Sequence, residues 1–375
     1  MTAVPNKLKD FRNFLYLCWK HLNLPEPTPI QYDMANFIQG EDQRIVINAF
    51  RGVGKSWITS AYVCHQLLLN PQKNILVISA SKNRADDFST FTLRLINEID
   101  VLAHLRPSES QRQSKVSFDV RPARASHAPS VKSLGITGQL TGSRSDLVIA
   151  DDVETPVNSA TMGMRDKLST QVKEFESIIK PQGRIIFLGT PQTEMSLYNE
   201  LPKRGYKLRI WTSRYPSIKQ LRAMDTSLAP MIKQKWTKEN EGEPTDPLRF
   251  DATDLQEREA SYGRSGFNLQ FMLDTSLSDA DKYPLKLSDL VVMTTNPSTA
   301  PEKVIWASSP ELRVEDVPCV GLALDYYYRP MQTQGDWLKY HGSVLAVDPS
   351  GRGKDETAYC VVKMLNGNLY LTEAG

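Results

Sequence analysis

The segment AFRGVGKS, residues 49–56, has the residue types and the spacing of a phosphate-binding loop. Gly52 and Gly54 let the backbone turn sharply, so that neighbouring N–H groups point at one polyphosphate. Lys55 places a positive charge near the β- and γ-phosphates, and the Ser56 hydroxyl is a ligand for Mg²⁺. The segment therefore predicts a site for a nucleoside triphosphate with Mg²⁺. The alternative is an ordinary glycine-containing surface turn.

Two positions of this loop are irregular. Ala49 occupies the first glycine position of the full pattern, and Arg51 is unusual in a loop that closes around phosphates. An arginine so placed can stabilise charge on the γ-phosphoryl group, which contributes roughly 10³ to 10⁵ in rate. With Val53 between the glycines, residues 51–56 form the expected ATP-binding segment, and Arg51 is also a candidate catalytic residue.

An apolar run that ends in acids, LVIADDVE at residues 147–154, is the second chemical feature. Such a strand is the partner of a phosphate loop: the first acid, Asp151, holds Mg²⁺, and a nearby carboxylate deprotonates the attacking water. Glu154, with the longer side chain, is favoured narrowly as this base, and Asp152 is its rival. Aspartate also caps turns after strands, which is the structural alternative.

A third feature is the turn at residues 189–191, which follows the apolar run RIIFL. A small polar residue that ends a strand beside the phosphate loop can sense the γ-phosphate and relay hydrolysis to motion. Gly189, Thr190 and Pro191 are therefore candidate coupling residues. A plain Gly-Thr-Pro turn is the competing interpretation.

Alternating strand and helix patterns must position these residues. The continuous apolar runs are typical of a parallel sheet covered on both faces. The expected strands are residues 44–48, 74–80, 130–136, 146–150, 184–188 and 206–211, with an edge strand at 115–120. The expected helices are residues 57–69, 83–102 and 161–179, the last closed by Pro181 and Gly183. The predicted class is α/β, a P-loop NTPase of the ASCE, RecA-like type with a mostly parallel sheet flanked by helices.

The chain has 375 residues, which exceeds one hydrophobic core. We expect a helical segment at 1–43, an ATPase core at 44–214, a Pro-rich lid or linker at 215–335 and the start of a further domain at 336–375. Helical pieces are expected near residues 253–263 and 266–273. Asn366-Gly367 predicts a hairpin between two apolar runs. A turn is expected at residues 349–355.

The overall composition is that of an ordinary globular chain, with a net charge of +2, 40% hydrophobic residues and no transmembrane or signal segment in the pattern. The scattered cysteines and histidines predict no zinc site. Local basic stretches at residues 104–132 and 203–214 suit sequence-independent contacts to DNA phosphates, although a solvated surface is the simpler explanation for any single residue.

Five segments together resemble the large terminase subunit, or DNA maturase B, of short-tailed double-stranded DNA phages. They are the phosphate loop, residues 130–154, residues 184–201, GFNLQFML at 266–273 and VLAVDPSGRGKDET at 344–357. The resemblance covers essentially the whole chain in order. It implies an ATPase that drives DNA into a procapsid, followed by an RNase H-like nuclease that cuts concatemers.

Site residues follow from this resemblance by position. It implies that Arg51 contacts the γ-phosphate in cis, that Gln31 recognises the adenine, and that Asp348 is the first metal ligand of the nuclease. Asp152 stands where the family usually has Glu. The other nuclease acids would lie beyond Gly375, so the expectation is a fragment or half of a split gene with an incomplete, inactive nuclease.

The implied partners are double-stranded DNA, the small terminase subunit, the portal of the procapsid and further copies in a ring, with no membrane. Arg144 is a guess for an arginine that acts on a neighbouring subunit. The implied location is the host cytoplasm, and transiently the portal. Two alternatives remain open: a helicase-like DNA-dependent ATPase, and a non-catalytic module that binds nucleotide or procapsid.

Overall fold

A computed structural model of the chain describes residues 4–140, 142–192, 195–275, 290–307, 309–317, 326–349 and 357–375. It divides into two compact units, Met1–Asp279 and Ala280–Gly375. Each unit is described by itself. The four predicted domain ranges remain predictions.

The first unit is built on a seven-stranded sheet with the order β3-β4-β2-β5-β6-β1-β7. All neighbouring strands are parallel except the edge pair β3–β4. The strands are β1 (Arg44–Ala49), β2 (Ile75–Ser79), β3 (Ser117–Phe118), β4 (Val131–Gly135), β5 (Ser145–Asp151), β6 (Ile179–Gly189) and β7 (Lys207–Trp211). The predicted α/β class with a mostly parallel sheet is confirmed.

The strand order explains how distant segments meet. Strand β6 lies between β1, which leads into the phosphate loop, and β5, which ends in the acids. Because the three strands are parallel, their carboxyl ends lie at one edge of the sheet, where ligands bind in open α/β folds. The loop at 49–56, the acids at 151–154 and the turn at 189–191 therefore converge.

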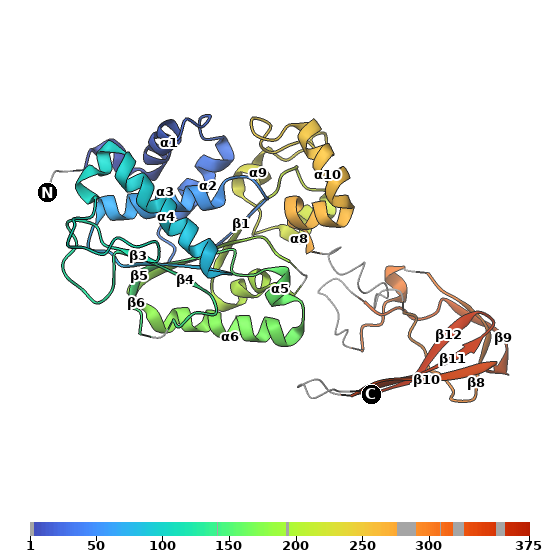
Figure 1. Cartoon of the computed structure of the whole chain (residues 1–375). Helices are drawn as coiled ribbons and strands as arrows, with labels where there is room; N and C mark the ends of the chain where they lie inside the picture. Colours follow the sequence, from blue (N-terminus) through green and yellow to red (C-terminus); the bar gives the residue numbers. More distant parts are fainter. Residues whose placement is uncertain are drawn as a thin grey trace. The chain divides into compact units, whose positions relative to one another are not determined.

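Helices cover both faces of this sheet (Figure 1). On one side lie α1 (Phe11–His21), α2 (Pro29–Gln39), α3 (Lys55–Leu69) and α4 (Lys82–Glu98); on the other lie α5 (Pro156–Ser159) and α6 (Met162–Ile178). Helix α7 (Leu197–Glu200) packs in the same core as α6. Successive strand residues alternate between the two cores, as the period of a strand requires. Ile45 and Ile47 belong to the core with α1–α3, and Val46 belongs to the core with α6.

Two sequence expectations in this unit were wrong in their boundaries. Pro181 and Gly183 do not close the helix, because β6 begins at Ile179 and includes both. The pairing with β5 shifts between Ser145 and Leu147, so these residues fall at an irregularity, where a strand tolerates proline. The helix expected at 83–102 ends at Glu98 and is followed by a 3₁₀ turn, η2 (Asp100–Leu105).

The segment after β7 packs on the same core as α1–α3. It forms α8 (Ile218–Met224), α9 (Pro230–Lys235), α10 (Ala252–Phe267) and the π-helix η4 (Asn268–Met272). The two predicted helical pieces correspond to α10 and η4, and α10 itself is interrupted at Gly263, whose φ is 68°. The buried residues of the whole segment after β7 include Met224, Ile232, Leu255 and Phe271. The segment thus lies within the first unit.

The second unit contains two small antiparallel sheets. One pairs β8 (Thr299–Ile305) with β9 (Gln332–Lys339), and the other has the order β10 (Gly342–Asp348), β11 (Ala358–Leu365), β12 (Asn368–Ala374). Asn366 and Gly367 join β11 to β12 with φ values of 49° and 80°, so the predicted hairpin is confirmed. The turn expected at 349–355 lies outside the described residues beyond Pro349. Within the described part of the chain, no helix combines the length and apolar character that a membrane crossing needs.

Candidate functional site

The phosphate-loop segment joins β1 to α3 at the rim of a cavity of about 780 Å³. Gly52 and Gly54 have φ values of 88° and 96°, a left-handed conformation that glycine adopts without strain. Gly54 caps the N-terminus of α3, so the positive end of the helix dipole faces the cavity. A cavity of this size suits a cofactor-sized ligand.

Lys55 is buried at the floor of this loop. Its Nζ donates to the carbonyl oxygens of Ala49 at 2.5 Å and Phe50 at 3.3 Å. Burial lowers the pKa of Lys55, while Asp152 and Asp151 oppose that shift. The ammonium group is therefore held by the backbone of the loop itself, at the position where phosphate oxygens would accept from it.

Ser56 and Asp151 join the loop to the acidic strand. The Ser56 Oγ donates to both Asp151 carboxylate oxygens, at 3.0 and 3.2 Å. Burial, reinforced by the neighbouring Asp152, raises the pKa of Asp151 to about 7. A hydroxyl and a carboxylate side by side are the oxygen donors that Mg²⁺ prefers, so this pair fits the metal implied by the sequence.

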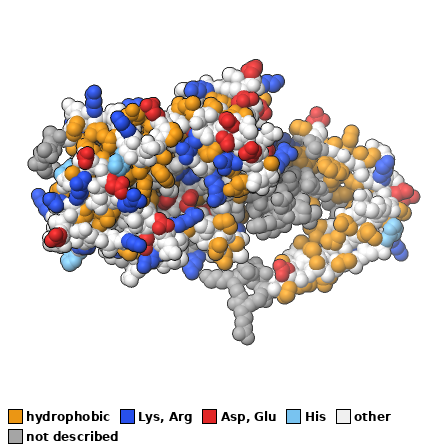
Figure 2. All heavy atoms as spheres, turned by 45° about the horizontal axis from the view of Figure 1, so that its top comes forward, with side chains coloured by type: hydrophobic (Ala, Val, Ile, Leu, Met, Phe, Trp, Pro, Cys, Tyr) orange, Lys and Arg blue, Asp and Glu red, His pale blue; other side chains and the backbone are white. Residues whose placement is uncertain are grey.

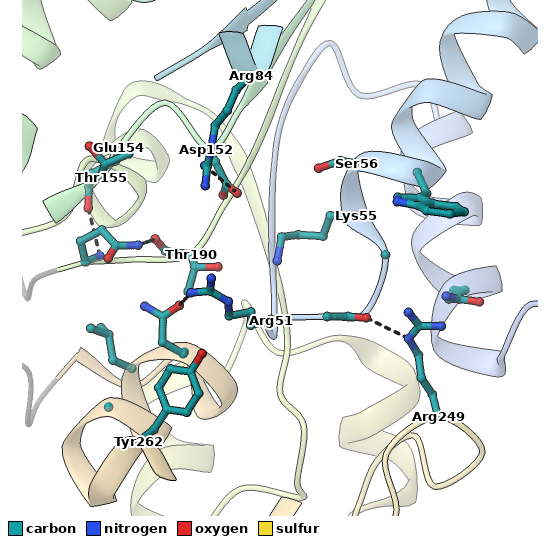
Figure 3. Close-up of a pocket in the computed structure, with 18 of the residues that line it drawn as sticks. Arg51, Lys55, Ser56, Arg84, Asp152, Glu154, Thr155, Thr190, Arg249 and Tyr262 are labelled. Atoms are coloured by element: carbon teal, nitrogen blue, oxygen red, sulfur yellow. Dashed lines mark hydrogen bonds and ion pairs between the residues drawn. The ribbon is translucent and has the colours of Figure 1, made fainter. Parts of the chain in front are cut away.

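Asp152 faces the cavity from a strained backbone position. Its φ is 47°, which is uncommon for a residue other than glycine and recurs at functional sites. The side chain is 37% exposed, and its Oδ2 lies 3.8 Å from an Arg84 guanidinium nitrogen at the start of α4 (Figure 3). Arg84 was not predicted from the sequence. It follows β2, the neighbour of β5, so its position became apparent only with the strand order.

Glu154 has a different environment from Asp152. It is 2% exposed, and its carboxylate accepts hydrogen bonds from Gln192 N, Ser196 Oγ and Leu197 N. Burial raises the pKa of Glu154, and these hydrogen bonds oppose the rise. Both residues line the cavity, but the Asp152 side chain is the more exposed, and the Glu154 carboxylate is held by three donors.

The predicted coupling residues lie at the end of β6, next to the acids. Thr190 lines the cavity and is almost fully buried. A Cβ added at Gly189 would lie 2.1 Å from Cζ of Tyr198, so only glycine fits the space left by that ring. Pro191 is also buried. All three residues therefore belong to the wall between β6 and α7.

Gln31 supports the opposite end of the loop. It is fully buried in α2, and its Nε2 donates to the Val53 carbonyl at 2.8 Å. Thr28 and Gln31 form a capping box that fixes the start of this helix. Trp19 and Leu24 also line the cavity. The lining at this end of the cavity is largely apolar, as in pockets that hold small organic ligands.

The segment after β7 holds the loop from its other side. The Arg51 backbone N donates to Gln270 O at 2.9 Å, and its guanidinium reaches Gln270 Oε1 at 3.4 Å. Arg249 donates from Nε to Gly52 O at 2.8 Å, and a Cβ at Gly52 would lie 2.8 Å from Phe250 Cζ. Arg249 and Gln270 were missed by sequence reasoning, because nothing local signals a contact across so many residues.

Of the remaining predicted residues, Arg144 does not line this cavity, and Asp348 belongs to the second unit. Asp348 ends β10 in the second unit, exposed and paired in register with Ala358. Among the described residues, no group of three or more His, Cys, Asp and Glu is arranged to hold a metal. Arg144 is occupied by the Ser143 and Ser177 carbonyls.

The basic stretch at 203–214 is largely neutralised by local partners. Lys203 pairs with Glu200, Lys207 with Asp42 and Arg214 with Glu259, and Arg209 stacks on the Phe37 ring at 4.1 Å. Figure 2 shows Lys and Arg side chains interspersed with Asp and Glu on the face in view. The stretch is therefore less open to phosphate than its sequence suggests.

Comparisons with known proteins match both units. Residues 46–191 match the family model "Terminase large subunit, T4likevirus-type, N-terminal", and residues 347–375 match "Terminase Bacteriophage T7, Ribonuclease H-like domain". The chain is 50% identical over 374 residues to the terminase large subunit of Enterobacteria phage T3, covering 98% of this chain and 64% of that protein.

Two solved structures show weaker likeness. One is the large terminase ATPase domain of Thermus phage P74-26, at 14% identity, covering 68% of this chain and 96% of that chain, with a TM-score of 0.37. The other is the large terminase of a thermophilic bacteriophage in complex with ADP, at 10% identity, covering 93% of this chain and 67% of that chain, with a TM-score of 0.38. Because both TM-scores are so low, neither likeness supports a conclusion about this chain. On the sequence match and the family models, the chain belongs to the phage large terminase subunits.

Proposed function

We propose that this chain is an ATP-hydrolysing motor subunit that translocates viral double-stranded DNA into a procapsid. The chain spans 64% of the length of its T3 relative, so the activities of the whole protein enter only as part of this proposal. The observation that carries it is the Ser56–Asp151 contact with Lys55 beside it, at the edge where β1, β5 and β6 end.

Residues of the loop bind the triphosphate in this proposal. The N–H groups of residues 52–56 and the Lys55 ammonium surround the β- and γ-phosphates, and Gln31 lies on the adenine side. Arg51 carries its charge at the cavity rim, where it stabilises charge that develops on the γ-phosphoryl group. That role requires Arg51 to exchange its weak side-chain contact with Gln270 for phosphate.

Magnesium would be held by Ser56 and Asp151, and when bound it neutralises phosphate charge. A carboxylate after β5 takes the proton from the attacking water, with Asp152 and Glu154 as the two candidates. Gly189, Thr190 and Pro191 transmit the state of the nucleotide, because Thr190 lines the same cavity.

The wider assignments follow the family. The proposed partners are double-stranded DNA, a small terminase subunit, a portal and further copies in a ring, in the host cytoplasm and then at the procapsid. Asp348 is the proposed first ligand of a divalent-metal nuclease site. We propose that residues 1–375 alone do not cut DNA, and metal-dependent cleavage by the purified chain would contradict this.

A strand-separation assay tests the motor against the helicase-like alternative. The purified chain is given ATP, Mg²⁺ and a forked duplex with one fluorescent strand, and hydrolysis and strand release are measured together. The expected result is hydrolysis stimulated by duplex DNA without release of the strand. Release of the strand would favour a helicase, and ATP binding without any turnover would favour the non-catalytic module.

A further inference from the structure

The Glu154 carboxylate is fully engaged with a single segment of the chain. Its Oε1 accepts from Gln192 N at 3.0 Å, and its Oε2 accepts from Ser196 Oγ at 3.0 Å and from Leu197 N at 2.6 Å. All three partners are donors, and they favour the ionised form of the carboxylate, because that form only accepts hydrogen bonds. The side chain therefore holds the start of α7 and the residue after the coupling turn.

The same segment is also fixed to the end of β6. Tyr198 OH accepts from Glu154 N and donates to Leu188 O, both at 3.4 Å, and its ring fills the space beside Gly189. Gln192 Nε2 donates to Thr190 O at 2.9 Å. The residues after β5 and the residues after β6 are thus one hydrogen-bonded body, with Glu154 at its centre.

A general base needs an oxygen that can reach the proton of a water molecule, directly or through one further water. Both Glu154 oxygens already accept from protein donors, and the residue is 2% exposed. Both acids line the cavity, but the Asp152 side chain, two positions earlier, is 37% exposed and lies beside Arg84. The geometry therefore separates the two acids into different tasks.

We infer that Glu154 is a positioning residue. It ties the acid-bearing end of β5 to residues 190–192 and 196–198, which we call the coupling segment. A change at Asp151 and Asp152 then moves this segment. Asp152 is then the carboxylate that faces the attacking water. This inference rests on the proposed ATP hydrolysis, because the change it transmits is the arrival and loss of the γ-phosphate.

Hydrogen–deuterium exchange of the full chain tests the inference, together with steady-state ATP hydrolysis. The variants are Glu154→Gln, which puts an amide where a carboxylate accepted, and Ser196→Ala, which removes one donor and is the milder change. Asp152→Asn is the matched control, since asparagine tolerates the left-handed backbone of that position. Each protein is measured alone, with ADP and with the non-hydrolysable analogue AMP-PNP.

In Glu154→Gln, the Leu197 amide should exchange about tenfold faster than in wild type, which corresponds to about 1.4 kcal/mol. Nucleotide should still protect residues 52–57, but its effect on residues 195–200 should be lost. The kcat should fall while the KM for ATP is unchanged. Ser196→Ala should shift exchange in the same direction by less. Asp152→Asn should leave the nucleotide-free exchange of the Leu197 amide unaltered while abolishing hydrolysis.

The inference would be overturned if both Glu154→Gln and Ser196→Ala exchanged at the same rates as the wild-type chain and only Glu154→Gln lost hydrolysis. Glu154 would then be the base. A wild-type chain that binds no nucleotide would overturn the proposed function and the transmission role together. The nucleotide-free exchange would still show whether Glu154 holds Gln192 and Leu197, so the two failures are distinguishable.

Discussion

Ser56 and Asp151 lie 95 positions apart, and the serine hydroxyl donates to both carboxylate oxygens of the aspartate. The contact exists because β1 and β5 are parallel strands whose carboxyl ends meet at one edge, with β6 between them. This contact connects the phosphate loop to the acidic strand directly, through two side chains of the protein. The mechanism proposed for this chain depends on that connection.

Removal of the Ser56 hydroxyl should weaken Mg²⁺ binding. In Ser56→Ala, the Mg²⁺ concentration that half-saturates ATP hydrolysis should rise about 10- to 100-fold, the loss usual when a metal site loses a supporting group. A Mg²⁺ titration of hydrolysis at saturating ATP measures this. Ser110→Ala, at an exposed serine outside the cavity, is the control and should match wild type.

The protonation of Asp151 should make folding stability depend on pH. Its pKa in the fold is about 7, above the ordinary value of 3.8, so the folded state binds this proton more tightly. The stabilisation is present below the ordinary pKa and is lost as pH rises through about 7. Asp151→Asn should therefore raise Tm relative to wild type above that pH and change it little in acid.

Thermal unfolding of both proteins across this pH range, without nucleotide or metal, measures the difference. A Tm difference that stays constant from acid to alkaline pH would show that the Asp151 pKa is not raised in the fold. In the same range, binding of ATP with Mg²⁺ should strengthen as pH rises, because the metal and the proton compete for one carboxylate.

Arg51 should matter for turnover more than for binding. Arg51→Ala should lower kcat by roughly 10³- to 10⁵-fold if the guanidinium reaches the γ-phosphoryl group, with a small change in KM. Gln270→Ala is the control, because it removes only a 3.4 Å side-chain contact and keeps the backbone acceptor of Arg51 N. Equal kcat in Arg51→Ala and wild type would mean that the arginine only borders the cavity.

Gly189 should tolerate no side chain. In Gly189→Ala the new methyl group meets the Tyr198 ring, and overpacking of this kind costs about 1–3 kcal/mol. Urea unfolding gives the free energy of unfolding. Gly163→Ala at the start of helix α6 is the matched control: no heavy atom lies within 4 Å of the added Cβ, so the change should not lower the free energy of unfolding. Equal effects at the two glycines would contradict the packing described at Tyr198.

The sequence predicted the sheet well, because the buried parallel strands are continuous apolar runs such as β1 and β2. It also predicted the loop and the acids, whose chemistry lies in short segments. It did not predict Arg84 or Arg249, since each reaches the site from a segment whose position depends on the strand order or on long-range packing. The contrast between Asp152 and Glu154 was equally invisible, because burial and hydrogen-bond partners are tertiary properties.

The helical elements α8 and α9 were missed for a related reason. Their segments are short and weakly periodic, and each helix is stabilised by packing against the shared core through residues such as Met224 and Ile232. A single turn or two of helix gains little from intrinsic propensity alone. Tertiary contacts therefore decide these elements.

The central claim is that this cavity hydrolyses ATP, and Lys55→Ala tests it most directly. Phosphate release by the purified chain with ATP and Mg²⁺ should be lost in Lys55→Ala, whereas Lys238→Ala, at an exposed lysine, should keep wild-type activity. Loss is expected because the Lys55 ammonium is the buried cation of the loop. Undiminished turnover in Lys55→Ala would contradict the account.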